Sequence, residues 1–296
     1  MVEEKNGFQV VANLIMILLS LFCIFPFLLL IVSSVTEESS LILNGYSFFA
    51  TDITFTAYRY LLVDSSGILR GYMISGLVTI IGTVANLTVT TLFAYGLSRK
   101  DLPGRGLFSF YLFFTMLFNG GLIPSYIMWT QVFHIKNTLL ALIIPNLLMN
   151  AFYVIMMRTY FTINIPDAVI EAARIDGAGE LFILPRIVLP MSLPIIATLA
   201  VLAGIGYWND WLNGLYYTNV ETLYGIQVLL NKMLLDAEYI KRSTNTSAAV
   251  ASIAATLPST GIKMAVAVMG ALPILAFYLF FQKFFVKGIV IGAVKG

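Results

Sequence analysis

The most regularly spaced polar residues lie between positions 167 and 178, inside a chain that is otherwise apolar. Asp167, Glu171 and Arg174 are four and three residues apart, so a helix places them on one face. A second face of the same helix carries Ile165, Ala168, Val169 and Ala172. A short amphipathic helix of this kind is suited to insertion into a groove of another protein. The chemistry that this pattern favours is therefore recognition of a partner.

The ends of this segment carry the residues that start and stop helices. Residues 164–167, Asn-Ile-Pro-Asp, predict a helix start, because Pro fits near the first helical position and an acid there suits the helix dipole. Gly177 and Gly179 permit a sharp turn after the helix. Leu-Pro pairs at 184–185 and 189–190 then mark the return to the membrane. We expect a docking helix held between two turns, although a generic amphipathic connector on the membrane surface has the same pattern.

A second polar group interrupts the apolar run from Leu193 to Thr218. Its members are Trp208, Asn209, Asp210, Trp211 and Asn213. Asp210 is the only ionisable residue inside a predicted span, and an intramembrane carboxylate is costly enough to be a functional candidate. Aromatic faces with neighbouring polar groups suit a sugar path. However, a rise of about 1.5 Å per residue places Asp210 toward the outer end of the helix, where an interfacial aromatic belt explains the residues equally well.

The chain contains no catalytic or metal-binding pattern. The predicted spans have no paired acids, histidine cluster or Ser/His arrangement, which argues against a membrane enzyme. His134 is the only histidine and has no ligand at metal-binding spacing. A phosphate loop ending in Gly-Lys-Ser/Thr is also missing, so the chain cannot hydrolyse ATP by that chemistry. An ion-coupled secondary transporter would more often carry several intramembrane charges, so the single carboxylate of Asp210, near the outer end of its span, fits that class poorly.

Composition and apolar runs define the elements that position these residues. Of 296 residues, 59% are hydrophobic and 11% are charged, against about 25% charged in an ordinary soluble domain. This composition indicates an integral membrane protein, and a net charge of +2 gives no reason to expect a nucleic-acid partner. We predict one all-α permease domain, 1–296, with six transmembrane helices. The spans fall near 10–35, 71–98, 107–128, 138–157, 193–218 and 264–282. The first run has no obvious small-residue cleavage site and is expected to be a retained span.

The distribution of Lys and Arg orients the predicted bundle. The bases expected on one face are Arg99, Lys100, Arg105, Arg158, Arg174, Arg186, Lys283, Lys287 and Lys295. The positive-inside rule makes that face cytoplasmic, together with both termini and the loop 158–192 that holds the docking helix. Loops 36–70 and 219–263 are then external. The second of these is a docking surface for an external protein or a plain solvated loop.

Three segments together resemble a known family. Residues 171–178, Glu-Ala-Ala-Arg-Ile-Asp-Gly-Ala, followed by Ile-Val-Leu-Pro at 187–190, resemble the EAA signature of binding-protein-dependent ABC importer permeases. The aromatic stretch 207–212 and the ending 285–296 are similar to the carbohydrate-uptake branch, and within it to MalG-like, LplC-type permeases. The resemblance covers essentially the whole chain. It implies a type I importer permease with the MetI-like fold in the bacterial cytoplasmic (inner) membrane.

The resemblance also implies a set of partners. Such a permease pairs with a second homologous permease, with a dimer of ATP-binding subunits that hold ATP and Mg, and with an extracytoplasmic sugar-binding protein, in contact with membrane lipid. It further implies a coupling helix seated in the ATPase. The coupling residues would be Glu171, Ala172, Ala173, Arg174, Asp176, Gly177 and Ala178. The expected function is ATP-driven import of a sugar, and the resemblance implies an oligosaccharide. The alternatives are another small polar solute or an ion-coupled secondary transporter.

Overall fold

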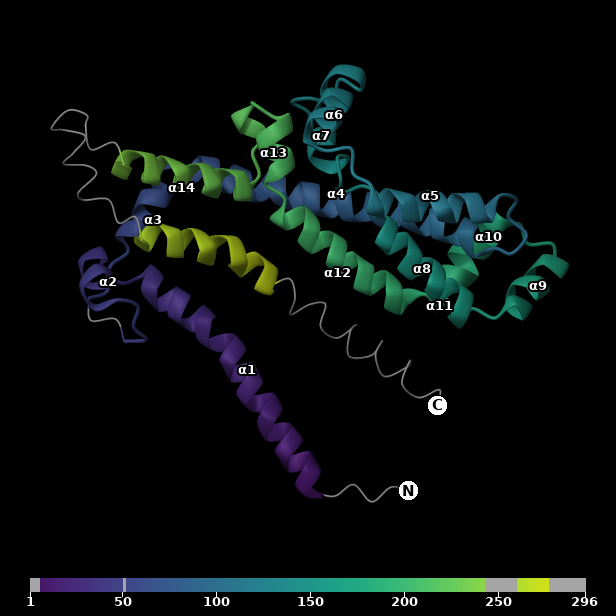
Figure 1. The fold of residues 1–296 in the computed structure, drawn as a ribbon, viewed down its shortest axis with the longest axis horizontal. Helices are drawn as coiled ribbons and strands as arrows, with labels where there is room; N and C mark the ends of the chain where they lie inside the picture. The colour runs from purple at the N-terminus through teal and green to yellow at the C-terminus, as the bar shows by residue number, and fades with distance from the viewer. Residues whose placement is uncertain (1–5, 50–51, 243–259, 277–296) are drawn as a thin grey trace. The chain divides into compact units, whose positions relative to one another are not determined.

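A computed structural model describes residues 6–49, 52–242 and 260–276 of the chain. These residues form helices joined by turns, and the sole β pairing among them is an isolated bridge between Thr36 and Ile53. The fold is therefore all-α, as predicted. The single predicted domain contains two compact units, residues 1–68 with 230–273 and residues 69–229 with 274–296. Two helices, α4 (Ser65–Ser98) and α14 (Ile226–Arg242), continue across the unit boundaries (Figure 1).

The first unit is built around α1 (Asn6–Ser34), α2 (Glu38–Asn44), α3 (Thr56–Leu61) and an apolar helix at 260–276. The carboxylate of Glu38 accepts backbone hydrogen bonds from Thr260 (3.0 Å) and Gly261 (3.0 Å), which fixes the start of the later helix beside α2. Most side chains of α1 are apolar and exposed on every side. Such a helix suits contact with lipid or with another membrane chain.

The second unit holds both polar groups singled out in the sequence. Its helices are the greater part of α4, α5 (Arg105–Leu117), α6 (Leu122–Ile127), α7 (Leu139–Ile143), α8 (Ala151–Asn164), α9 (Asp167–Ile175), α10 (Glu180–Ile183), α11 (Leu189–Met191), α12 (Leu193–Asn209) and α13 (Leu212–Tyr217). Two π-helical turns, Met128–Val132 and Leu184–Val188, extend α6 and join α10 to α11. Buried side chains of α4, α5, α8, α9 and α12 pack into one apolar cluster. This cluster is the support from which α9 extends.

The apolar segments are less continuous than the sequence predicts. Two helices, at 9–34 and 66–98, are long and apolar enough to span a membrane alone, and up to four spans result if two bent pairs count. One pair bends by 115° after Leu117, where the Asn-Gly-Gly sequence at 119–121 separates its two helices. The other pair bends by 83° at Ser192. The last predicted span, 264–282, lies outside the described residues beyond position 276.

The prediction that residues 138–157 form one continuous helix is wrong. Helix α7 ends at Ile143 and α8 begins only at Ala151, and α8 continues to Asn164, into the predicted loop 158–192. Pro145 has no backbone donor for a helical bond, and Asn146 has a φ of 61°. Side chains from other helices donate hydrogen bonds to the carbonyls that the break leaves without a helical partner. The bonds are Tyr207 Oη to Ile143 O (3.0 Å), Asn213 Nδ2 to Pro145 O (2.9 Å) and Asn86 Nδ2 to Leu147 O (2.7 Å). Broken helices are tolerated at membrane depth because such bonds replace the lost ones.

Candidate functional site

Helix α9 ends in a specific hydrogen-bonded turn. Gly177 has a φ of +83°, a conformation that residues with a side chain rarely adopt. Its N–H donates to Arg174 O at 3.0 Å, and the N–H of Ala178 donates to Ala173 O at 2.9 Å. These two bonds form a Schellman motif, in which the residue after the cap must be left-handed. The Asp-Gly-Ala sequence at 176–178 therefore has a local structural cause.

Most of α9 projects away from its unit. Ile170 is its one buried residue, at 5% exposure, whereas Ile175 is 86% exposed. Glu171, Ala172, Asp176 and Gly177 are exposed as well. Leu181, in the next short helix, is 94% exposed. Figure 1 shows α9 at the end of the second unit, on the far side from α13. Two strongly exposed apolar side chains, Ile175 and Leu181, thus lie on either side of the Gly177 turn.

Charged side chains bind α9 to the end of α4 and to the turn that follows it. At the start of α9, Lys100 Nζ lies 2.6 Å from Asp167 Oδ2. At its end, Arg174 Nη2 donates to Asp101 Oδ2 at 3.1 Å, and Arg174 Nε donates to Glu180 Oε1 at 3.1 Å. The hydroxyl of Tyr95, in the last turns of α4, also donates to Glu180. We call Tyr95, Asp101, Arg174 and Glu180 the α9 network.

The three carboxylates that pair with bases at the two ends of α9, those of Asp101, Asp167 and Glu180, stay ionised at neutral pH. The hydrogen bond from Arg174 lowers the pKa of Asp101, and the bond from Lys100 lowers the pKa of Asp167. Burial raises the pKa of Glu180, but the hydrogen bonds from Tyr95 and Arg174 outweigh it and lower the pKa overall. All three carboxylates therefore remain ionised across the physiological range.

Sequence spacing identified part of this site and missed the rest. Asp167, Glu171 and Arg174 were expected on one face, yet the first and last pair with residues from other segments rather than with each other. Lys100 and Asp101 lie about seventy positions away, so no helical spacing could connect them with α9. Glu180 falls after the turn and is six positions beyond Arg174. Only the fold brings these groups together.

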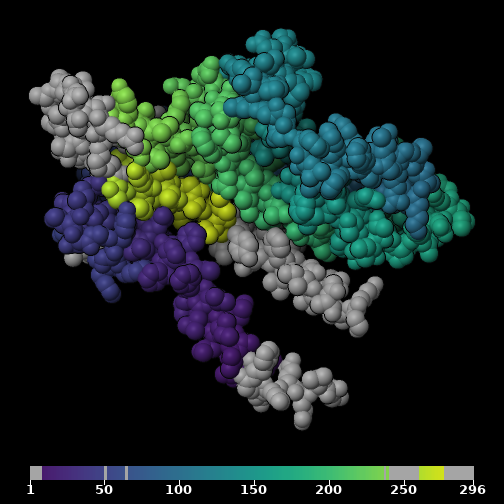
Figure 2. Space-filling view, in the orientation of Figure 1, coloured from purple at the N-terminus to yellow at the C-terminus, as the bar shows by residue number. Residues whose placement is uncertain are grey.

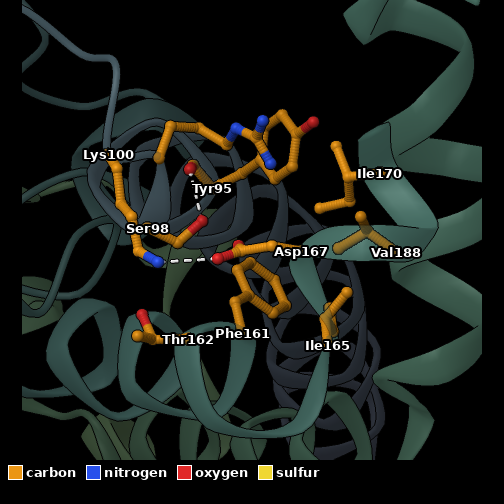
Figure 3. A pocket seen from close by; sticks show the side chains of 10 residues that line it. Tyr95, Ser98, Lys100, Phe161, Thr162, Ile165, Asp167, Ile170 and Val188 are labelled. Carbon is orange, nitrogen blue, oxygen red and sulfur yellow. Dashed lines mark hydrogen bonds and ion pairs between the residues drawn. The ribbon is translucent and has the colours of Figure 1, made fainter. Parts of the chain in front are cut away.

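A recess separates α9 from the end of α4 (Figure 3). Its floor is apolar, with Phe161, Ile165, Ile170 and Val188, and its rim carries Ser98, Lys100 and Asp167. Ile170 is the one buried residue of α9 in the cluster, half-buried Ala173 packs against the same cluster, and the ion pairs lie at the rim. Helix α9 is thus attached to the unit by a few apolar contacts and by charged ones near its two ends.

The second polar group surrounds the junction of α12 and α13. Helix α12 ends at Asn209, and Asp210 adopts an extended conformation in which its Oδ1 accepts the N–H of Asn213 at 3.3 Å. Trp208 is half-buried and stacks on Tyr72, with ring centroids 6.3 Å apart. Asn209 and Trp211 are exposed. This part of the chain therefore presents polar and aromatic groups beside a broken helix.

Asn213 differs from the other members of this group. Its side chain is 2% exposed, and its amide donates to Pro145 O. That bond satisfies a carbonyl freed by the α7–α8 break, so the side chain serves the fold. A role in direct sugar contact fits Asn213 less well than it fits Trp208, Asn209 or Trp211.

Named bacterial transport proteins are similar to this chain over nearly its whole length. The Bacillus subtilis (strain 168) polygalacturonan/rhamnogalacturonan transport system permease protein YtcP is 35% identical over 281 residues, which cover 95% of this chain and 96% of YtcP. Protein LplC of the same organism is 36% identical over 273 residues, covering 92% and 90%. The chain matches no family model.

A solved structure has the same fold. It is a bacterial ABC transporter involved in the import of the acidic polysaccharide alginate, and the matched chain aligns with a TM-score of 0.75 at 27% identity. The alignment covers 96% of this chain and 99% of that one. The agreement in sequence and in fold therefore extends to the segments that hold both polar groups.

Proposed function

Because this chain belongs to the permease family of binding-protein-dependent ABC sugar importers, we propose that α9 couples its sugar path to ATP hydrolysis on a partner subunit. The chain is a multi-pass membrane protein and a transport subunit, not an enzyme. It forms one half of the translocation path, and a second homologous permease forms the other half. Both termini and α9 lie on the cytoplasmic side of the bacterial inner membrane.

The observation that carries the coupling role is the exposure of α9 together with its attachment. Ile175 and Leu181 present apolar side chains to solvent around the Gly177 turn, as a surface that is covered by a partner would. Behind this surface, Arg174 connects α9 to the end of α4 through Asp101. A push on the exposed face is therefore transmitted to a helix long enough to span the membrane. The coupling residues remain those predicted, Glu171 to Arg174 and Asp176 to Ala178, with Glu180 and Asp101 added.

The proposal includes a set of partners and their cofactors. Two ATP-binding subunits hold ATP and Mg and receive α9 in a cleft, because this chain has no phosphate loop of its own. An extracytoplasmic sugar-binding protein delivers the substrate to the opposite face. The cargo is an oligosaccharide, for which the names of the relatives give support: YtcP is named for polygalacturonan and rhamnogalacturonan, and the solved transporter for alginate.

The function is tested by purification and reconstitution of the whole transporter. The chain should co-purify with an ATPase subunit, and uptake into proteoliposomes should require internal ATP and the external binding protein. Substrate-stimulated ATPase activity, screened over neutral and acidic oligosaccharides, then identifies the cargo. Uptake that continues without ATP while a membrane potential is maintained would instead indicate a secondary transporter.

We place the sugar path at Trp208, Asn209, Asp210 and Trp211, and this placement has its own test. Trp208→Ala removes a ring that stacks on Tyr72, and we expect uptake to fall about tenfold, as for loss of one aromatic contact of about 1–1.5 kcal/mol. Asp210→Ala removes the acceptor at the start of α13 and should also reduce uptake. Phe49→Ala, at an exposed site in the first unit, is the control. Normal uptake in both variants would favour an interfacial aromatic belt.

A further inference from the structure

Two arginines meet where α5 and α8 pack together. Arg105 is the first residue of α5, and Ser109 lies one turn further along the same face, with its hydroxyl donating to Arg105 O at 2.8 Å. Arg158 of α8 lies against that turn, since its Nη1 is 3.4 Å from Ser109 Oγ. The guanidinium of Arg158 is thus held beside the first turn of α5.

No carboxylate within the described ranges pairs with either arginine. Two acids of the adjacent α4–α5 turn and α9 pair with other bases, Asp101 with Arg174 and Asp167 with Lys100. Arg105 Nε is buried and has no acceptor among these residues. Burial lowers the pKa of Arg158, and the charge of Arg105 lowers it further, so the two cations are close enough to repel each other. An anion between them would remove this repulsion.

The start of α5 adds to the positive potential. Gly104, which precedes the helix, has a φ of +72° and offers no side chain to cap the first backbone N–H groups. The first turn of this 13-residue helix also contains no acid. The positive end of the helix dipole therefore lies beside Arg105.

An apolar surface continues from the arginine pair along α5. The exposed side chains of this helix include Leu107 (71%), Phe108, Phe110, Tyr111, Phe113, Phe114 and Leu117. Helix α5 lies on the surface of the second unit in Figure 2. A cation pair at the end of an exposed apolar helix matches a molecule with an anionic head and a hydrocarbon tail.

We propose that Arg105 and Arg158 bind the phosphate of an anionic phospholipid such as phosphatidylglycerol. The acyl chains lie along the apolar face of α5. The orientation proposed above assigns this site to the cytoplasmic leaflet. The site itself does not depend on that orientation. Because α8 leads directly into α9, a lipid held between α5 and α8 fixes the base of the coupling segment. Anionic lipid is then a structural component of the working transporter.

The test uses the complete transporter, purified with its ATPase subunits and reconstituted in nanodiscs of phosphatidylcholine with increasing phosphatidylglycerol. Native mass spectrometry measures retained phosphatidylglycerol. The double variant Arg105→Gln with Arg158→Gln should bind it on the order of thirtyfold more weakly, from about 1 kcal/mol per basic residue. The pair Arg105→Lys with Arg158→Lys should retain most binding. Arg59→Gln, an exposed arginine of the first unit, is the control for charge.

Several outcomes would overturn the proposal. Equal phosphatidylglycerol retention in the double glutamine variant and the native transporter would do so, as would equal loss in Arg59→Gln. Displacement of the lipid by millimolar inorganic phosphate would assign the pair to a free anion. Loss of the ATPase subunits with lipid retention unchanged would assign it to an acidic group of a protein partner. Lipid retention is measured without transport. A negative result for lipid binding can therefore be told apart from a negative result for the coupling role of α9.

Discussion

Replacing Gly177 with aspartate is expected to abolish sugar uptake while the protein remains folded in the membrane. A Cβ built on Gly177 meets no atom of the chain within 4 Å, so the substitution causes no clash inside this subunit. The new carboxylate would instead lie on the exposed face beside Ile175, where the ATPase is proposed to dock. Burial of an unpaired charge in an interface costs about 2–5 kcal/mol, which predicts loss of at least thirtyfold in uptake.

Two companion variants separate the charge from the backbone conformation. Gly177→Asn has nearly the same size as aspartate and tolerates a positive φ, so it should keep much more activity. Gly177→Ala adds only a methyl group but must adopt the left-handed conformation, at about 1–2 kcal/mol. Uptake is measured in proteoliposomes and membrane insertion by detergent extraction. Normal transport by Gly177→Asp would refute the coupling assignment.

Reversing the charge of Arg174 is the second large effect that we expect. Arg174→Glu places a carboxylate beside Asp101 and Glu180, so two attractive contacts become repulsive ones. Exposed ion pairs contribute little individually, but here one residue holds two acids from two segments. We expect α9 to lose its alignment with α4 and uptake to fall about tenfold, an order-of-magnitude expectation for a small network. Basal ATPase activity should persist without stimulation by the binding protein.

Exchange of charges tests whether the network itself matters. The double variant Arg174→Glu with Glu180→Arg restores an opposite-charge pair and should recover part of the stimulated ATPase activity. Tyr95→Phe removes only the hydroxyl that donates to Glu180 and should cause a smaller loss. If the double variant is no better than Arg174→Glu alone, the ion pair is not what positions α9.

The sequence predicted the features of this site that are local. The helix at 167–175 and its end at Gly177 follow from residues within a few positions of each other. The Asp-Gly-Ala sequence corresponds to a hydrogen-bonding pattern that requires glycine at one place.

What could not be predicted depends on contacts between distant segments. Nothing near Arg174 in the sequence identifies Asp101 as its partner, because only packing of α9 against α4 brings them together. The break after Ile143 was also missed, since Pro145 alone is compatible with a kinked but continuous helix. It exists because Asn86 and other donors on distant helices satisfy the freed carbonyls.

Photo-cross-linking from α9 tests the central claim most directly. Cys23 is the only cysteine, so Cys23→Ser gives a background in which Ile175→Cys carries a single benzophenone label. Illumination of the purified transporter should join position 175 to an ATPase subunit. The same label at Phe49→Cys, equally exposed at 86% but in the first unit, should not do so. Capture of no ATPase from position 175, or equal capture from both positions, would contradict α9 as the coupling helix.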